Sequence, residues 1–386
     1  MKQVVSSDFK LGIMAGGQLG KMLILAANNW DIQTYVLDPS NDCPSANCCT
    51  KLINGSIVNY DDVYAFGQLV DAITVEIENV NVEALRKLKQ EGKIVHPDPD
   101  ALALIKDKGL QKQFYAEHNL PTSPFELYDG EQAIREAIDN GQLKFPFVQK
   151  ARTAGYDGKG VAVIKDESSL KNLLAAPSVV EDAVIIKKEL AVTVARNPSG
   201  ETKCFPIVEM EFSETANLVE QLICPANVDA KITQQANELA TSIITELNMC
   251  GLLAVEFFLD TDDRLWINEV APRPHNSGHH TIEACVTSQY EQHLRAILDF
   301  PLGNTDIISP SVMINLLGEE GYTGSVNYDG LAECMKVAGA KFHIYGKKET
   351  RPFRKMGHAT ILASTLNEAK ERANEVKNTL KVKAIS

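Results

Sequence analysis

The stretch "LLAVEFFLDTDDRLWINEV", residues 252–270, decides the fold of this chain. Two runs rich in apolar residues flank the polar turn "TDDR", which is the pattern of an antiparallel hairpin. If Asp260 pairs with Leu265 across a four-residue loop, counting away from the turn along both strands places Glu256 opposite Glu269. Directly opposed side chains share one face of a sheet, with Cβ atoms about 4.5–5.5 Å apart.

Two carboxylates this close repel each other unless a cation or a proton lies between them. Glu256 also lies among Val255, Phe257 and Phe258, a setting that disfavours an unpaired charge. Oxygen ligands on a short hairpin suit Mg²⁺, which usually binds together with substrate phosphates. We therefore predict that Glu256 and Glu269 hold Mg²⁺. The alternative is an exposed pair whose register is displaced by one or two residues.

Length and charge limit the classes of protein to which this chain can belong. A chain of 386 residues suggests two or three domains. Its net charge of −13 argues against a general nucleic-acid-binding or membrane-surface protein. No apolar run reaches the roughly 20 residues that cross a bilayer, and no signal peptide is recognisable, so we expect a cytoplasmic protein. The eight cysteines have no C-x-x-C spacing, which favours free thiols over disulfides or a zinc site.

The order of expected elements indicates an α/β fold. In the first hundred residues, strands at 9–14, 34–38, 72–80 and 93–97 alternate with helices at 20–30 and 82–89. This alternation predicts a parallel sheet with helices on its faces. The middle of the chain predicts a helix from 99 to 121, strands within 145–164, 183–196 and 203–212, and a helix at 229–248. A Pro/Gly-rich connector at 301–310 precedes a smaller mixed segment.

Two glycine-rich loops are candidates for binding anions. In "RTAGYDGKG", residues 152–160, the glycines allow the backbone to come close to a ligand, and free N–H groups suit phosphate oxygens. Lys150 adds positive charge at its entrance, although the sequence is no Walker A loop. In "GGQLG", residues 16–20, a helix N-terminus follows a strand. An NAD site is the alternative there, because Asp38 stands where a ribose-binding acid would, but position 15 is alanine.

Two further clusters carry polar or charged side chains. In "WINEVAPRPHNSGHH", residues 266–280, His275 and His279 have the spacing of helical metal ligands, but Pro274 and Gly278 predict a loop and disfavour zinc. The segment 341–358 has a net charge of +5 from six lysines and arginines against Glu349. An exposed, solvated edge is the alternative, but turns at its glycines and Pro352 favour a small phosphorylated ligand.

Taken together, these motifs resemble one family, N5-carboxyaminoimidazole ribonucleotide synthetase, an ATP-grasp enzyme of purine synthesis. The resemblance covers "GGQLGKM", "TVEIENV", "DKGLQKQF", "KARTAGYDGKGV", "INEVAPRPHNSGHHT", "EQHLRAILDFPLG", "PSVMINLLG" and "RPFRKMGH" in the family's order. It implies a Rossmann-like N-terminal domain (1–100), an ATP-grasp domain (101–300, small lobe about 115–185) and a small mixed α/β C-terminal domain (301–386). It further implies a homodimer.

The resemblance also implies the site residues. ATP would lie among Lys108, Lys150, Gly155, Tyr156, Asp157, Gly158, Lys159, Gly160, Val161, Glu181, Asp182, Ala183, Val184, Glu189, Asn268 and Glu269, with Mg²⁺ on Glu256 and Glu269. The catalytic set would be Glu76, Tyr156, Asp157, Lys159, Arg273 and His275. The second substrate would contact Gln18, Asn276, Ser277, Lys347, Arg351, Arg354 and Lys355.

The reaction implied by this resemblance is phosphorylation of bicarbonate by ATP to carboxyphosphate, followed by carboxylation of 5-aminoimidazole ribonucleotide. An ATP-dependent carbon–nitrogen ligase of this kind works mainly by positioning and electrostatics. The family pattern has glycine where this chain has Ala15 and Phe353. Alternatives within the superfamily are a formate-dependent transformylase and a biotin carboxylase, which "PHNSGH" and the short C-terminal segment disfavour. An alternative of another class is a dehydrogenase or a non-catalytic nucleotide-binding Rossmann protein.

Overall fold

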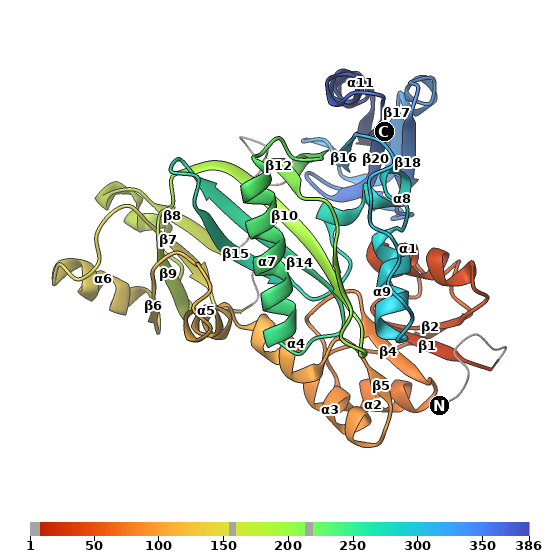
Figure 1. The fold of residues 1–386 in the computed structure, drawn as a ribbon, viewed down its shortest axis with the longest axis horizontal. Helices are drawn as coiled ribbons and strands as arrows, with labels where there is room; N and C mark the ends of the chain where they lie inside the picture. Colours follow the sequence, from red (N-terminus) through yellow and green to blue (C-terminus); the bar gives the residue numbers. More distant parts are fainter. Residues whose placement is uncertain (1–7, 154–159, 213–218, 386) are drawn as a thin grey trace.

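A computed structural model describes residues 8–153, 160–212 and 219–385 (Figure 1). The N-terminal part is a five-stranded parallel sheet in the order β3-β2-β1-β4-β5. Helices α1 and α9 (Gln289–Ile297) pack on one face, and helices α2 and α3 pack on the other. This arrangement confirms the predicted Rossmann-like α/β sheet. Its elements are β1 Lys10–Met14, α1 Gln18–Asn28, β2 Gln33–Asp38, β3 Lys51–Asn54, α2 Tyr60–Gln68, β4 Ala72–Val75, α3 Val82–Gln90 and β5 Ile94–Val95.

A small antiparallel sheet follows and extends to the left in Figure 1. Its strand order is β6-β9-β7-β8, and its apolar core is closed by side chains of α6 and of a 3₁₀ helix. Two helices precede this sheet, and the elements of this part are α4 Pro99–Lys106, α5 Lys108–Glu117, β6 Phe125–Tyr128, α6 Glu131–Asp139, β7 Phe147–Ala151, β8 Val161–Ile164, η1 Glu167–Asn172 and β9 Ser178–Asp182. Strands β7 and β8 flank the glycine-rich loop, as the sequence predicted.

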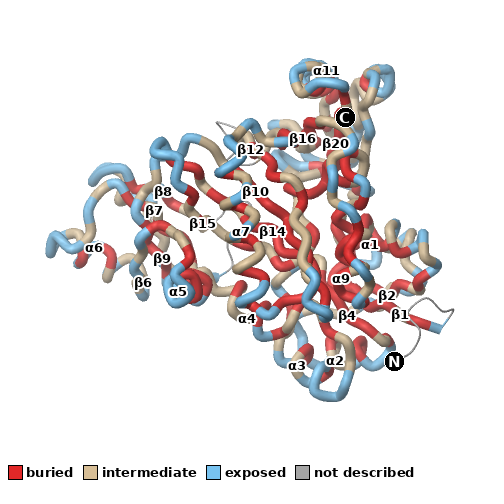
Figure 2. Tube along the Cα trace, viewed as in Figure 1, coloured by how far each residue is buried: buried red, intermediate tan, exposed pale blue. Residues whose placement is uncertain are grey.

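A nine-stranded sheet forms the centre of the molecule, and most of its strand residues are buried (Figure 2). Its order is β15-β14-β10-β12-β13-β16-β20-β18, with β11 beside β10. Pairing of β13 with β16 makes the sheet continuous across residue 300. The strands are β10 Ile186–Arg196, β11 Thr202–Cys204, β12 Val208–Phe212, β13 Val219–Cys224, β14 Gly251–Asp260, β15 Leu265–Ala271, β16 Ser311–Leu317, β18 Ala340–Ile344 and β20 Lys355–Leu362.

The remaining elements lie between and after the strands of this sheet in the chain. They are α7 Ala230–Glu246, η2 Asn276–Gly278, α8 Thr281–Ala284, α9 Gln289–Ile297, β17 Gly324–Asp329, α10 Leu331–Cys334, β19 Glu349–Thr350, α11 Leu366–Thr379 and β21 Lys381–Ala384. Strands β17, β19 and β21 form a separate three-stranded sheet. Among the described residues, no helix combines the length and the apolar content that crossing a bilayer requires.

Alternation along β10 decides which face of the central sheet is left for ligands. Leu190, Val192 and Val194 pack beneath α7 in one apolar core. Because successive strand residues point to opposite faces, Glu189 and Ala191 point away from α7. The strand partners of Glu189 and Ala191 on β14 are Phe258 and Glu256, which lie on the same face. The carboxylates therefore project from the side of the sheet that α7 does not cover.

The helix predicted from residue 99 to 121 is wrong in one respect: it is two helices. Asp107 leaves the helical conformation, with φ −111° and ψ 108°, and its carboxylate caps α5 by accepting bonds from the N–H groups of Gly109 and Leu110. Arg152 holds that carboxylate through two bonds of 2.9 and 2.7 Å. The break therefore sets the direction of α5 and places Lys108 in its first turn.

The strand predicted at 72–80 is also too long, because β4 ends at Val75. The carboxylate of Glu76 turns to accept hydrogen bonds from the backbone of α1, so the chain leaves the sheet at this residue. Strand β3 was missed, since its four residues are exposed or half-buried and carry little apolar periodicity.

Replacing Ala15 with glycine is expected to stabilise the protein by about 1 kcal/mol. Ala15 joins β1 to α1 with φ +71°, a left-handed conformation that costs an alanine roughly 1–2 kcal/mol and glycine much less. Urea unfolding of the variant measures the change. As a control, Ala26→Gly within α1 should destabilise by about 1 kcal/mol, since its backbone is helical. Equal destabilisation of both variants would contradict the assignment of strain to Ala15.

Candidate active site

The hairpin of β14 and β15 brings the two predicted metal ligands together, although the predicted turn is wrong. Leu265 pairs with Leu259, not with Asp260, and Asp260 N donates to the Arg264 carbonyl at 3.0 Å, so the turn is 261–263, one residue shorter than predicted. Continued without interruption, that register would put Glu269 on the opposite face of the sheet. A β-bulge at Asn268 inserts one residue into β15 and restores the pairing of Glu256 with Glu269. The predicted pair is thus confirmed through two irregularities that cancel.

Electrostatics distinguish the two carboxylates. The side chain of Glu256 is 17% exposed, and burial, followed by the charges of Glu269 and Glu189, raises its pKa. Burial also acts to raise the pKa of Glu269, but the ammonium group of Lys108 contacts that carboxylate and lowers its pKa overall. Glu269 is therefore an ionised carboxylate paired with a lysine, whereas the positive charge near Glu256 is too weak to offset its burial.

The donor chemistry of this pair fits a hard divalent cation. Glu256 and Glu269 supply carboxylate oxygens from directly opposed positions, and Glu189 lies close enough to raise the pKa of Glu256. Among the described residues, no group of three or more His, Cys, Asp or Glu side chains forms a complete metal site. Two carboxylates are the protein share that Mg²⁺ takes when substrate phosphates complete its coordination.

A buried network of lysines adjoins the carboxylate pair. Lys150 on β7 donates to Asn268 at the bulge at 2.7 Å and lies 2.9 Å from Glu181 Oε2. Lys112 on α5 lies 2.9 Å from the other oxygen of Glu181. Burial raises the pKa of Glu181, but Lys150 and Lys112 lower it overall, so it stays ionised. The network thus links the small sheet, α5 and the hairpin through contacts between charged and polar side chains.

The other predicted ATP-side residues lie around this network. The side chain of Glu189 faces it from β10, beside the ring of Phe258, over which Lys150 lies at 5.9 Å from the centroid. Burial raises the pKa of Glu189 to about 7. Asp182 is the last residue of β9, and Ala183 and Val184 lie in the connection to β10.

The glycine-rich loop is described only in part. Gly155, Tyr156, Asp157, Gly158 and Lys159 lie outside the described residues. Gly160 has φ +78°, and its carbonyl accepts a bond from Ala151 N. Val161 pairs with Lys150 across the two strands. The described end of the loop, Gly160 and Val161, therefore lies next to Lys150.

A second group of side chains lies beyond the hairpin. Arg273 Nη2 lies 2.8 Å from Glu78 Oε1, and both side chains are largely buried. His275 Nε2 lies 3.8 Å from Glu256 Oε1, and its Nδ1 lies 2.9 Å from Ser277 Oγ. Both polar atoms of the Asn276 side chain are buried without a protein partner, which suits contact with a ligand. The proline-flanked segment thus extends from the carboxylate pair towards this second group.

In the "GGQLG" turn, the backbone N–H groups that could bind a ligand anion already donate to a carboxylate of the protein. Glu76 accepts bonds of 2.6 Å from the N–H groups of both Gly17 and Gly20. Asp38 accepts a bond of 2.7 Å from Gly16 N, so the acid that the NAD alternative needed is held inside the turn. Gln18 is half-buried at the start of α1.

The basic segment contacts this region through some of its members. Lys355 on β20 is close enough to Glu256 to lower the pKa of that carboxylate. Lys347 Nζ donates to the backbone carbonyl of Lys355 at 2.7 Å. Arg354 donates to the carbonyl of Glu349, and Arg351 is exposed. The C-terminal segment therefore reaches the carboxylate pair through Lys355.

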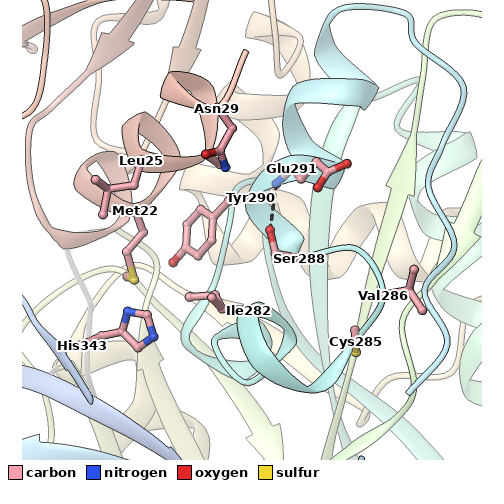
Figure 3. Close-up of a pocket in the computed structure, with 11 residues that line it drawn as sticks. Met22, Leu25, Asn29, Ile282, Cys285, Val286, Ser288, Tyr290, Glu291 and His343 are labelled. Atoms are coloured by element: carbon pink, nitrogen blue, oxygen red, sulfur yellow. Dashed lines mark hydrogen bonds between the residues drawn. The ribbon is translucent and has the colours of Figure 1, made fainter. Parts of the chain in front are cut away.

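Three of the other histidines, His279, His343 and His358, stack instead of converging on one point. The ring of His358 stacks on His279 at 4.6 Å and on His343 at 4.5 Å between centroids. His343 also lines a cavity of about 300 Å³ between α1 and the α8–α9 region (Figure 3). The labelled residues of that cavity include Met22 and Tyr290 and none of the carboxylates or lysines described above.

Two residues of the site were missed by the sequence reasoning. Lys112 lies four residues after Lys108, a spacing that indicates a shared side of the helix but not the contact with Glu181. Glu78 lies two residues after Glu76, and the predicted strand would have put both side chains on one face of the sheet. Because β4 ends at Val75, Glu76 instead contacts the turn at the start of α1 and Glu78 contacts Arg273.

Comparison with known proteins matches three family models along the chain. Residues 9–106 match the ribonucleotide synthetase preATP-grasp domain. Residues 113–290 match the ATP-grasp domain, and residues 311–372 match the phosphoribosylaminoimidazole carboxylase C-terminal domain.

Individual relatives are similar over nearly the whole chain. The N5-carboxyaminoimidazole ribonucleotide synthase of Bacillus subtilis is 37% identical over 372 residues, which cover 95% of each chain. The crystal structure of the synthetase from Thermotoga maritima is 42% identical with a TM-score of 0.89, covering 98% of this chain and all of the other. A structure from Aspergillus clavatus, in complex with ADP and 5-aminoimidazole ribonucleotide, is 31% identical with a TM-score of 0.87, covering 97% and 99%.

Proposed function

The chain belongs to the N5-carboxyaminoimidazole ribonucleotide synthetase family, and from this premise we propose how its residues divide the reaction. It is an ATP-dependent ligase with an ATP-grasp fold that carboxylates 5-aminoimidazole ribonucleotide in purine biosynthesis. ATP and the ribonucleotide are its small-molecule substrates. Bicarbonate and a carboxyphosphate intermediate complete the proposed reaction.

The observation that carries the proposed ATP site is the network around the hairpin. Lys108, Lys150 and Asn268 surround the Glu256–Glu269 pair on the face of the sheet that α7 leaves open. In this proposal Lys150 and the adjoining glycine-rich loop contact the phosphates, residues 181–184 at the end of β9 contact adenine, and Glu189 accepts bonds from the ribose hydroxyls. Glu256 and Glu269 would hold Mg²⁺, which would neutralise charge on the transferred phosphoryl group.

The second substrate is proposed to lie beyond the hairpin. His275 lies 3.8 Å from Glu256, and Arg273 lies 2.8 Å from Glu78; these two side chains would hold the bicarbonate-derived carboxyl group. The unpartnered amide of Asn276 supports a polar contact with the ribonucleotide, and Lys355 supports a phosphate position near β20. Gln18, Ser277, Lys347, Arg351 and Arg354 complete the proposed set.

The roles of Glu76 and of the glycine-rich loop follow from the same division. Glu76 holds the turn at Gly17 and Gly20, which supports a role in shaping the substrate side. Tyr156, Asp157 and Lys159 are proposed to act on the transferred carboxyl group and the aminoimidazole.

The proposed domains are 1–100, 101–300 and 301–386, and the three matched family models support this division. The homodimer stays a prediction, which light scattering of the purified protein tests.

The activity itself is tested by mixing the protein with Mg·ATP and bicarbonate and measuring ADP release with and without 5-aminoimidazole ribonucleotide. The ribonucleotide is expected to stimulate ADP release, because it consumes carboxyphosphate. Absence of stimulation would contradict the proposed acceptor.

Affinity for ATP is expected to weaken as pH falls through about 7. The pKa of Glu189 is raised to about 7, so the carboxylate is ionised above this pH and protonated below it. Only the ionised form accepts hydrogen bonds with both oxygens. The KM for ATP should therefore rise severalfold between about pH 8 and about pH 6. Glu189→Gln should show a high KM with little change over this range, and an unaltered pH profile in that variant would contradict the role of Glu189.

A further inference from the structure

One face of α5 faces the proposed active site with four polar side chains. Lys108, Gln111, Lys112 and Tyr115 follow the spacing that aligns residues on one side of a helix. Lys108 contacts Glu269, and Gln111 Oε1 accepts bonds from Val270 N at 3.3 Å and from the Tyr115 hydroxyl at 2.8 Å. The helix thereby contacts the hairpin at two successive residues.

Lys112 is the charged member of this face that no proposed substrate contact uses. Its side chain is 4% exposed, and its ammonium group has three fixed partners. It lies 2.9 Å from Glu181 Oε1, donates to Ser123 Oγ at 3.2 Å, and donates to Thr122 Oγ1. A buried ammonium with this many partners is held in one position.

Glu181 divides its two oxygens between two lysines. Oε1 faces Lys112, and Oε2 lies 2.9 Å from Lys150. Lys150 has a second contact with Asn268 at 2.7 Å, so it lies between a carboxylate on one side and the hairpin on the other. Removing the charge of Lys112 would leave Glu181 with Lys150 as its remaining buried lysine partner among these contacts. Lys150 would then be held more strongly at Glu181, because the repulsion between the two ammonium groups would be lost.

We propose that Lys112 is a positioning residue of this ligase: by sharing Glu181, it leaves the ammonium group of Lys150 available to the phosphates of ATP. The proposal rests on the proposed role of Lys150 as a phosphate contact. Lys112 itself touches neither substrate, and its effect reaches ATP through Glu181 and Lys150.

Titration of Lys112 offers a readout that a purely structural role would not give. Burial, together with the ammonium groups of Lys150 and Lys108, lowers its pKa to about 8, while Glu181 acts in the opposite direction. The ammonium form is present below this pKa and is lost as pH rises through it. The affinity for ATP should therefore decline above about pH 8 in the unmodified enzyme. Arginine stays charged throughout this range, so Lys112→Arg should move the decline to higher pH.

The experiment compares Lys112→Met, Lys112→Arg and the control Lys106→Met in the full chain with Mg·ATP, bicarbonate and 5-aminoimidazole ribonucleotide. Lys106 lies on the neighbouring helix α4 and donates to the Val80 carbonyl, so its replacement removes a half-buried lysine outside the network. We expect Lys112→Met to raise the KM for ATP about tenfold and to change the KM for the ribonucleotide less than about twofold. Lys106→Met should leave both constants near those of the unmodified enzyme.

Thermal unfolding of each variant distinguishes a displaced Lys150 side chain from a loss of folding, because breaking a buried ion pair is itself destabilising. A folded Lys112→Met variant with an unchanged KM for ATP would overturn the proposal. If that variant does not fold, Lys112→Arg decides the question: a decline that stays at about pH 8 overturns the proposal, and one that moves upward supports it. Failure of the unmodified enzyme to release ADP in response to the ribonucleotide would count against the proposed function instead.

Discussion

Replacing Glu269 with glutamine is expected to lower kcat/KM for ATP about a thousandfold. This carboxylate lies opposite Glu256, contacts Lys108, and is the partner whose pKa is lowered. Glutamine keeps the size of the side chain but removes the charge that the proposed Mg²⁺ and Lys108 both need. Steady-state ADP release in the presence of bicarbonate and the ribonucleotide measures the loss.

A matched control is Glu209→Gln on β12 of the same sheet. Glu209 precedes Met210, the strand partner of Glu189, so it projects from the other face, where Lys188 lies 2.6 Å away. This variant is expected to change kcat/KM less than about threefold, since a single partly exposed ion pair contributes little. Glu269→Gln with turnover close to that of the control would rule out Glu269 as a metal ligand.

Replacing Arg273 with lysine is expected to reduce turnover with the ribonucleotide about a hundredfold, while the Kd for ATP changes little. The Arg273 side chain is 17% exposed, its Nη2 lies 2.8 Å from Glu78, and its Nη1 donates to the Pro274 carbonyl at 3.2 Å, so the guanidinium group is fixed and its remaining N–H groups are the ones offered to a carboxylate. A lysine ammonium cannot make both contacts in the same geometry. Parallel measurement of ATP binding and of carboxylated product separates the two substrate sides.

Arg264→Lys serves as the control for that exchange. Arg264 lies at the turn of the same hairpin, is 62% exposed, and pairs with Asp260 at 2.9 Å. Its replacement should leave turnover within about twofold, because exposed ion pairs contribute little. Arg273→Lys with normal turnover, or with an equal loss of ATP binding, would contradict a role confined to the carboxyl side.

The sequence was sufficient to identify the face of the hairpin but not its exact pairing. Apolar periodicity placed the strands, and two carboxylates among aromatic residues indicated a shared site. A shorter turn and a bulge at Asn268 have no clear signal in composition, since polar residues occur in both. Their effects on register are opposite, so the pairing of Glu256 with Glu269 survived an incorrect turn.

The inward face of α5 could not be read from periodicity alone. The break at Asp107 depends on Arg152, which is 45 residues away in sequence. The proposed role of Lys112 on α5 depends on its contact with Glu181, which lies on β9 of the small sheet. Contacts of this range come from tertiary packing, whereas helix spacing predicts only which residues share a side. Family resemblance indicated Lys108 and Lys150, but it did not indicate Lys112, which pairs with Glu181.

The pairing of β13 with β16 has a consequence for making chimeric enzymes. Leu222 and Met313 are direct partners, so the segment that carries Lys355 is joined to the ATP-side strands by a backbone ladder. A C-terminal segment exchanged from a relative at residue 300 must reproduce this register, because a shift of one residue turns every side chain of β16 to the other face. Chimeras joined in register should keep the spacing between the two substrates, whereas those one residue out of register should fold poorly or lose coupling between ATP consumption and carboxylation.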